Sequence, residues 1–509
     1  MSLKSQPPLQ PQRTVLFMGS ARVGKSSLCG YILLDHKPNT ISRHCKRIKE
    51  LFNEDREEAV FGCYGKKSLH CREEQSLRIA IHSYYSPEIR MINDNCTPTT
   101  ANHINMNEWE VNEGLTFLYV SSKKKKINCF VSACFLADIG VLVVDVSNTG
   151  SSFEQDFNSE ESTMKHQLQI AQACGMENII VCLNKCDCEE KSTTDQCNRV
   201  STCDISSLCE SYHQVTATIQ HYLKQMNWKQ SNIFFIPTSG TKGYNVTARH
   251  EPYSFYEGPS LLEAIKEMAV KREVESILEK QPFRFSVYNC HRIGGVGPVV
   301  TGKVESGMVK KADVLLTHVS SHEVKSIEIA YHQVEHASAG DFCSLCLRNT
   351  CHSVMKFWRF LCNSRTELED FDSFEAIIRV LYTPNQQVRA GFGCDLHFAI
   401  NHCSCKLDDI ISLLDDDMND HLLSNSNKKI ISKFPEGIRA AQIAQVRIRT
   451  FRSNFNKLIA LPLKTFSDCP QLSRILLVDQ AKRLLAFGYV THLNRKARKN
   501  LEQQEDVIY

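Results

Sequence analysis

The chain has 509 residues, a length that predicts two to four domains rather than one hydrophobic core. Its 60 lysines and arginines against 57 aspartates and glutamates leave a net charge of only +3, which indicates neither a nucleic-acid footprint nor a polybasic membrane patch. No apolar run is long enough to cross a bilayer, and residues 1–13 lack a hydrophobic signal core. We therefore expect a soluble, cytoplasmic protein.

A phosphate-binding loop is the first recognisable feature in chain order. An apolar run at residues 14–18 predicts a buried strand, and residues 27–34 predict a helix that begins at about Ser27. Between them lies a complete G-x-x-x-x-G-K-[ST] pattern, formed by Gly19, Ser20, Ala21, Arg22, Val23, Gly24, Lys25 and Ser26. An ordinary Gly/Ser turn is the alternative, but strand, loop and helix occur in the order that the motif requires.

The residue types of this loop suit a phosphate ligand. Glycines at both ends let the backbone wrap closely around a phosphate, and the amides at the helix start point at its oxygens. Lys25 is expected to reach the terminal phosphates, and the Ser26 hydroxyl is expected to coordinate magnesium.

The next hundred residues carry weaker signals. Residues 44–75 are polar and charged and predict a helical or mobile surface. Residues 77–85 and 88–93 predict the two strands of a hairpin, and residues 97–105 predict a loop. Four consecutive lysines, 123–126, lie in a segment (residues 107–128) that we interpret as a solvated insertion.

Regular α/β alternation follows this segment. Apolar runs at residues 140–146, 178–183 and 233–236 predict central parallel strands, with helices predicted at 163–174 and 215–226. The alternation predicts a doubly wound, mainly parallel sheet whose ligands bind at the carboxyl ends of the strands.

Two polar motifs at those strand ends predict a guanine site. Asn184, Lys185 and Asp187 follow one strand, and Thr238, Ser239 and Gly240 follow the next. The aspartate can accept hydrogen bonds from N1 and the exocyclic amine of guanine, which adenine cannot supply. The asparagine can face the purine edge, the lysine stem can lie over the ring, and a backbone amide of Ser239 or Gly240 can bind O6.

All-β texture begins after a helix that is predicted at residues 260–278. Short runs at 283–288, 299–304, 314–319 and 323–329 predict a small barrel. A second β region spans residues 373–490 and is interrupted by an acidic stretch, residues 407–427, that we expect to be helical.

The chain contains 23 cysteines, which raises the possibility of a metal site. Cys343 and Cys346, with Cys351 and His352, form the best zinc candidate. Residues three apart on the strand expected at 342–347 point to opposite faces, so these two thiols could not share an ion. We interpret most of the cysteines as small buried hydrophobic residues in a reducing compartment.

From residue 14 to about residue 492 the sequence resembles elongation factor 1-alpha and its relatives, the translational GTPases that include release and ribosome-rescue factors. Outside the nucleotide motifs the resemblance rests on residues 293–297, 301–307, 323–328, 339–341 and 466–472. It implies a GTP-binding domain (14–280) and two β-barrel domains (281–369 and 370–493), while composition predicts a disordered tail (1–13) before them and a basic tail (494–509) after them. It also implies GTP or GDP with Mg²⁺ as ligands, and the ribosome and aminoacyl-tRNA as partners, with no membrane partner.

The two switch elements of that family are missing. Alignment on the predicted strands places Arg78 where the first switch has a magnesium-binding threonine. The second switch, Asp-Ala-Pro-Gly-His, falls on a stretch that includes Asn93, Asp94, Cys96 and Thr97. Loss of the water-orienting histidine should slow phosphoryl transfer by several powers of ten, so we assign no catalytic residue.

Three functions remain open at this point. The first is a divergent elongation factor that delivers aminoacyl-tRNA to the ribosome and hydrolyses GTP slowly. The second is a pseudo-GTPase that holds guanine nucleotide structurally and docks a protein partner on its barrels. The third is a termination or ribosome-rescue factor. The missing switch chemistry favours the second, whereas the resemblance of the whole chain favours the first.

Overall fold

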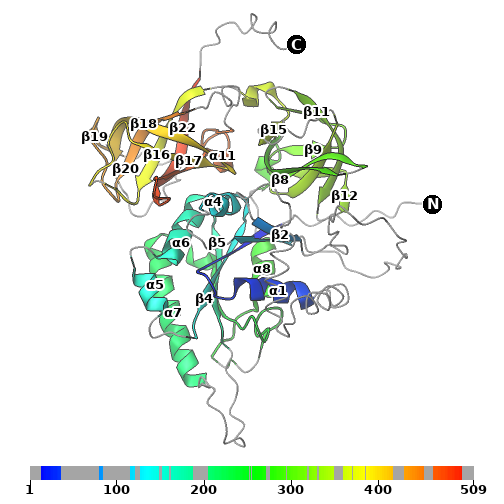
Figure 1. Ribbon diagram of the computed structural model, residues 1–509, viewed down its shortest axis with the longest axis vertical. Helices are drawn as coiled ribbons and strands as arrows, with labels where there is room; N and C mark the ends of the chain where they lie inside the picture. The colour runs from blue at the N-terminus through cyan, green and yellow to red at the C-terminus, as the bar shows by residue number, and fades with distance from the viewer. Residues whose placement is uncertain are drawn as a thin grey trace, which may run out of the picture.

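The computed structural model shows an α/β domain below two β domains that lie side by side (Figure 1). It describes residues 13–35, 79–83, 115–120, 127–147, 152–159, 162–186, 205–250, 253, 255–270, 275–293, 295–317, 320–329, 332–348, 359–368, 371–384, 386–415, 429–451 and 462–495. Among these residues no helix is both long and apolar enough to span a membrane.

The α/β domain is built on a six-stranded sheet with the strand order β2-β3-β1-β4-β5-β6. Neighbouring strands pair in parallel except β2 and β3, which are antiparallel, so the predicted mainly parallel sheet is confirmed. The strands are β1 (Arg13–Met18), β2 (Ile79–Ser83), β3 (Leu115–Val120), β4 (Ile139–Asp145), β5 (Asn178–Asn184) and β6 (Ile233–Pro237).

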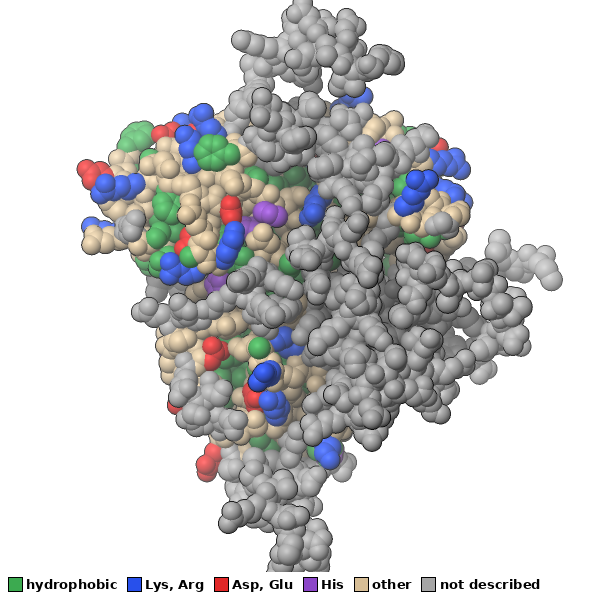
Figure 2. Space-filling view, viewed as in Figure 1, with side chains coloured by type: hydrophobic (Ala, Val, Ile, Leu, Met, Phe, Trp, Pro, Cys, Tyr) green, Lys and Arg blue, Asp and Glu red, His purple; other side chains and the backbone are tan. Residues whose placement is uncertain are grey.

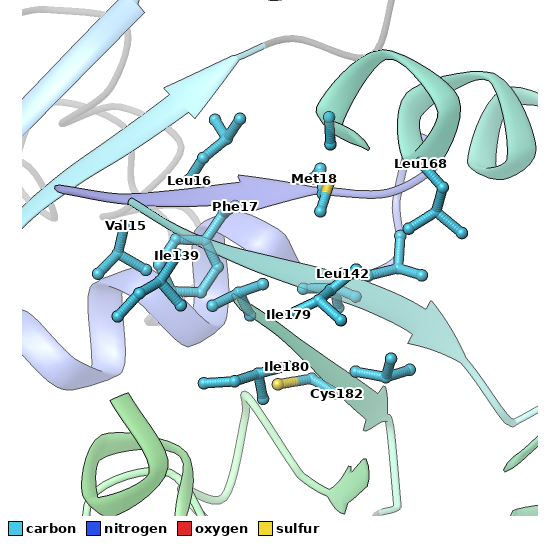
Figure 3. Close-up of a cluster of buried hydrophobic side chains, with 14 of the residues drawn as sticks. Val15, Leu16, Phe17, Met18, Ile139, Leu142, Leu168, Ile179, Ile180 and Cys182 are labelled. Atoms are coloured by element: carbon cyan, nitrogen blue, oxygen red, sulfur yellow. The ribbon is translucent and has the colours of Figure 1, made fainter. Parts of the chain in front are cut away.

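Helices cover the sheet, and its central strands are accordingly apolar along almost their whole length. Figure 3 shows side chains of β1, β4 and β5 packed together, with Leu168 of α6 beside them. The helices are α1 (Lys25–Asp35), α4 (Ile127–Leu136), α5 (Ser152–Asn158), α6 (Thr163–Ala173), α7 (Ile205–Gln225), the short η2 (Gln230–Asn232), α8 (Leu261–Val270) and α9 (Glu275–Leu278).

The middle domain is a closed β structure. Its seven-stranded sheet has the order β10-β15-β7-β8-β14-β11-β12, and a further pairing of β10 with β11 closes it. The strands are β7 (Arg284–Ile293), β8 (Gly297–Ser306), β10 (Val314–Leu316), β11 (Ser321–Ile329), β12 (His332–Val334), β14 (Phe342–Leu347) and β15 (Phe360–Cys362), and β9 (Met308–Lys310) pairs separately with β13 (His336–Ser338).

The C-terminal domain is a second closed β structure, as predicted. Its strand order is β17-β21-β22-β16-β20-β18-β19, with β17 also pairing with β18. The strands are β16 (Phe371–Val380), β17 (Gly393–Phe398), β18 (Asn401–Leu414), β19 (Ile430–Lys433), β20 (Ile443–Thr450), β21 (Arg474–Val478) and β22 (Leu484–Arg495), and the short helices are η3 (Arg365–Leu368), before β16, and α11 (Pro470–Ser473). Because β22 continues to Arg495, the predicted tail begins too early at residue 494.

The helix predicted from residue 407 is wrong, because residues 407–414 belong to strand β18. The acidic residues that favoured a helix face arginines of the neighbouring strand β20. Asp408 lies 2.5 Å from Arg449, and Asp409 lies 2.9 Å from Arg447. Figure 2 shows charged side chains of both signs on this domain. The remainder of the predicted helix, residues 416–427, lies outside the described residues.

The interpretation of residues 107–128 as an insertion is also wrong for the part that the structure describes. Residues 115–120 form β3, which pairs in parallel with β1 and antiparallel with β2. The antiparallel partner of β2 in the described sheet is therefore β3, and the second predicted hairpin strand, residues 88–93, lies outside the described residues.

The zinc candidate divides between described and undescribed residues. Cys343 and Cys346 both lie buried on β14, and burial raises the pKa of the Cys343 thiol. Cys351 and His352 lie outside the described residues. The described cysteines are free thiols, and most are buried, in agreement with their interpretation as small hydrophobic residues.

Polar contacts join the α/β domain to both β domains. The ammonium of Lys303, on β8, lies 2.8 Å from the carboxylate of Asp138 and donates to the Leu136 carbonyl at 3.0 Å. Asp138 also accepts a hydrogen bond from the Thr14 amide at 2.9 Å. On the other side, the Leu484 amide of β22 donates to His166 Nε2 of α6 at 3.2 Å.

Candidate nucleotide-binding site

The predicted site residues gather at the carboxyl edge of the sheet. The phosphate loop follows β1, Asn184 ends β5, and residues 238–240 follow β6. Parallel strands end at the same edge, so three sequence-distant motifs meet there. The contacts below bring the loops after β1 and β6 together through the end of β5.

Close packing explains both glycines of the phosphate loop. Gly19 has φ +129° and Gly24 has φ +95°, in the region that favours glycine. A Cβ on Gly19 would lie 2.3 Å from the Val143 carbonyl oxygen, and one on Gly24 would lie 2.1 Å from Asn184 Nδ2. Any side chain at either position would push the loop away from the ends of β4 and β5.

Lys25 points into the curve of the loop. Its ammonium donates to the carbonyls of Gly19 at 2.9 Å and Ser20 at 2.5 Å. The residue is buried, and burial lowers the pKa of its side chain to about 8. Helix α1 begins at Lys25, so its first amides are available to an anion at this point. The side chain of Ser26 lies outside the description, and its role toward magnesium stays a prediction.

Helices α5 and α6 hold the first part of the loop. The Gly19 amide donates to Gln167 Oε1 at 2.6 Å, and the Ser20 hydroxyl donates to Asp156 Oδ2 at 2.9 Å. Neither residue was predicted from the sequence. They lie over 130 positions from the loop, and no motif marks them.

The side chain of Asn184 joins the phosphate loop to the loop after β6. Its Nδ2 donates to the Val23 carbonyl at 2.8 Å, while its Oδ1 accepts from the Gly240 amide at 2.9 Å and the Thr238 hydroxyl at 3.3 Å. The side chain is 2% exposed. In the described structure Asn184 therefore braces the loops, and its predicted contact with the purine edge stays a prediction.

The amides predicted to bind O6 have acceptors inside the protein. The Ser239 amide donates to the Tyr244 carbonyl at 3.1 Å, and the Gly240 amide donates to Asn184. Binding of O6 would require one of these amides to exchange its acceptor, and the predicted contact stays a prediction.

The remaining base-binding residues are described in part. Lys185, with φ 70°, forms an ion pair at 2.5 Å with Asp145 at the end of β4, and its side chain is half-exposed. Asp187 lies outside the described residues, as does Arg78 of the first switch, so their predicted roles stay predictions.

Strand order changes the position expected for the second switch. The alignment places that switch directly after the strand that pairs with β2, and this strand is β3. Residues 121–126, which read Ser-Ser-Lys-Lys-Lys-Lys, connect β3 to α4. Residues 121–126 therefore take the position of the second switch in the alignment, in place of the stretch that contains Asn93, Asp94, Cys96 and Thr97. Both stretches lie outside the described residues. Neither stretch supplies the glycine or the histidine of the family motif in its place.

Comparisons with known proteins agree with the fold and the motifs. The elongation factor Tu GTP binding domain matches residues 128–271, and the GTP-eEF1A C-terminal domain-like family matches residues 373–491. Elongation factor 1-alpha of Aeropyrum pernix is 27% identical over 357 residues, which are 70% of this chain and 73% of that protein. The Plasmodium falciparum elongation factor 1-alpha is 25% identical over 384 residues, 75% of this chain and 77% of that protein.

A solved structure shares the whole architecture. The GTPase-like domain of Saccharomyces cerevisiae Ski7, crystallised with GTP, is 16% identical and has a TM-score of 0.63. The similarity covers 95% of this chain and 98% of that one. At this level of identity the likeness shows a shared fold.

Proposed function

Because this chain belongs to the elongation factor 1-alpha family of translational GTPases, we propose that it is a translation factor that binds guanine nucleotide at the carboxyl edge of its sheet. The observation that carries the proposal is the Asn184 brace, which holds the phosphate loop and the loop after β6 together. Both loops are thereby fixed next to each other, as one ligand with a phosphate end and a base end would need.

The cradle suits a nucleotide in its charge and its hydrogen-bond donors. The amides at the start of α1 would bind the inner phosphates, Lys25 would reach the terminal phosphates, and Asp187 would select guanine. Gly24 lets the loop lie directly against Asn184, because a Cβ there would come within 2.1 Å of Asn184 Nδ2.

Magnesium fits the site with few protein ligands. The Ser26 hydroxyl would bind the ion, whose other ligands would be phosphate oxygens and water. Among the described residues no group of three or more His, Cys, Asp or Glu side chains could hold a metal, so the nucleotide itself would bring most of the coordination. Bound there, the ion would neutralise part of the phosphate charge.

Within the family we propose GTP-dependent delivery of aminoacyl-tRNA to the ribosome, with slow hydrolysis. The two curated relatives described above are both elongation factors 1-alpha, and their similarity spans at least 70% of this chain. The charge balance of the chain gives no independent support for tRNA binding.

A second candidate has an observation of its own. The residues after β3 are two serines and four lysines, in place of a glycine sensor and a water-orienting histidine. This favours a pseudo-GTPase that keeps nucleotide for stability and uses its β domains to dock a protein partner.

Equilibrium binding of fluorescent GDP and GTP tests the nucleotide site. We expect unlabelled GDP and GTP to displace the probes and a large excess of ATP to leave them bound. Lys25→Ala should abolish binding, whereas Lys229→Ala, which removes an exposed lysine by η2, should not. Displacement by ATP, or no binding of either probe, would overturn the proposal.

Two ribosome experiments separate the candidates. GTP-dependent retention of charged tRNA on filters and phosphate release stimulated by ribosomes would support the elongation factor. Nucleotide binding without either activity would support the pseudo-GTPase. Co-purification with a release-factor-like partner would point to the termination or rescue role instead.

A further inference from the structure

We propose that Arg22 binds the terminal phosphate of GTP and gives this protein a preference for GTP over GDP. This inference rests on the proposed nucleotide function and assigns a specificity-determining residue within that site.

Arg22 lies between two sets of hydrogen bonds, here called clamps, that hold the phosphate loop. Before it, the Gly19 amide is held by Gln167 and the Ser20 hydroxyl by Asp156. After it, the Val23 carbonyl is held by Asn184. Only residues 21 and 22 remain between these anchors, so the backbone of Arg22 is fixed at both ends.

The clamps also give the loop a direction. Val23 and Gly24 lie against Asn184, which ends the strand that leads into the predicted base-binding motif. Gly19 and Ser20 lie against α5 and α6 on the other side. A nucleotide whose base lies by β5 and β6 would extend its phosphates away from Asn184, past the exposed side chain of Arg22.

The loop contains two cationic side chains, which differ in burial. Lys25 is buried and bound by loop carbonyls, so it would approach the phosphates from inside the loop. Arg22 is exposed, at φ 66°, a conformation that non-glycine residues keep only when their surroundings impose it. Its long side chain can reach a phosphate beyond the enclosed one.

Guanidinium chemistry suits this task. Arginine is always charged and presents a planar fork of donors that matches two phosphate oxygens. A charge-assisted contact of this kind needs neither a switch glycine nor a magnesium-binding threonine, and this chain has neither at the aligned positions. Recognition of the third phosphate would then come from the loop itself.

The test compares dissociation constants of GTP and GDP for Arg22 variants, with magnesium and with EDTA. We expect the wild-type chain to bind GTP more tightly than GDP in both conditions. Arg22→Ala should weaken GTP binding by roughly ten- to a hundredfold, the worth of one charge-assisted contact, and change GDP binding by less than about threefold. Arg22→Lys should retain part of the preference.

Two further variants separate charge from backbone. Arg22→Gly relieves the positive-φ conformation and should fold at least as well, yet lose the same GTP affinity. Arg439→Ala removes an exposed arginine of the C-terminal domain and should change neither constant. Equal GTP-to-GDP ratios in the wild type and Arg22→Gly would overturn the role of Arg22 while leaving nucleotide binding intact. Failure of the wild type to bind any guanine nucleotide would instead refute the proposed function.

Discussion

Removal of the Asn184 side chain is the most direct test of how the site is held together. Asn184→Ala deletes three hydrogen bonds, to Val23, Thr238 and Gly240, at a position that is 2% exposed. The Val23 carbonyl and the Gly240 amide each lose that bond, and a buried polar group without a partner costs about 1–3 kcal/mol. Two such groups cost about 2–6 kcal/mol together, and water that enters the loosened site offsets part of this, so we expect the two loops to lose about 2–4 kcal/mol of mutual support.

This cost should appear as lost nucleotide affinity, because the loops must be brought together again before a ligand can bind. At about 1.4 kcal/mol per tenfold, GDP and GTP affinities should both fall by roughly 30- to 1,000-fold. Titration of the fluorescent nucleotides measures both. Asn184→Asp keeps the acceptor for Gly240 but places a carboxylate against the Val23 carbonyl, so it should weaken binding as well.

A matched control lies on the same strand. Asn178 begins β5 at the opposite edge of the sheet, where it is paired with Ile139, and Asn178→Ala should leave both affinities unchanged. If Asn184→Ala bound nucleotide as tightly as the wild type, the two loops would be held together by other contacts, and the role of Asn184 would be refuted.

Two predictions concern stability. Lys303→Met leaves the buried Asp138 carboxylate without its ammonium partner and should lower the free energy of unfolding by about 3–5 kcal/mol. The double variant with Asp138→Asn should recover most of that stability. Urea unfolding measures both, and a double variant whose loss equals the sum of the two single losses would contradict the prediction. Burial, and then the stacked His402, lower the pKa of His397 from 6.5 to about 3, with Asp395 opposing them. Between pH 6.5 and about 3 the imidazole of the unfolded chain binds a proton and that of the folded chain does not. The contribution of His397 to the free energy of unfolding is therefore complete above about pH 6.5 and is lost as the pH falls toward 3. Between pH 7.5 and 4.5 the wild type should lose about 3 kcal/mol more unfolding free energy than His397→Gln, and equal losses would refute the assignment.

Local patterns predicted much of the fold because the information lay in contiguous residues. The strands and helices around the phosphate loop and before Asn184 show as apolar periods of the expected length. The glycines of the loop are required by contacts within 2.3 Å of a Cβ, and a motif records that requirement in sequence.

What the sequence could not predict depends on pairing between distant segments. Residues 115–120 form a central strand because β1 and β2 lie on either side of them, although polar residues and four lysines surround them in the sequence. Asp408 and Asp409 suggest a helix until Arg447 and Arg449 are placed opposite them. Gln167 carries no motif at all, since only the packing of α6 brings it to Gly19.

Helix α6 also has a consequence for communication across the molecule. Its consecutive residues His166 and Gln167 contact the C-terminal domain and the phosphate loop, and the Arg474 guanidinium lies against Gly175 just beyond its end. Thermodynamic reciprocity then applies: a partner that shifts this helix through the C-terminal domain must alter guanine nucleotide affinity by the same factor that the nucleotide alters the partner's. A protein without recognisable switches would in that way still couple its nucleotide site to its C-terminal domain.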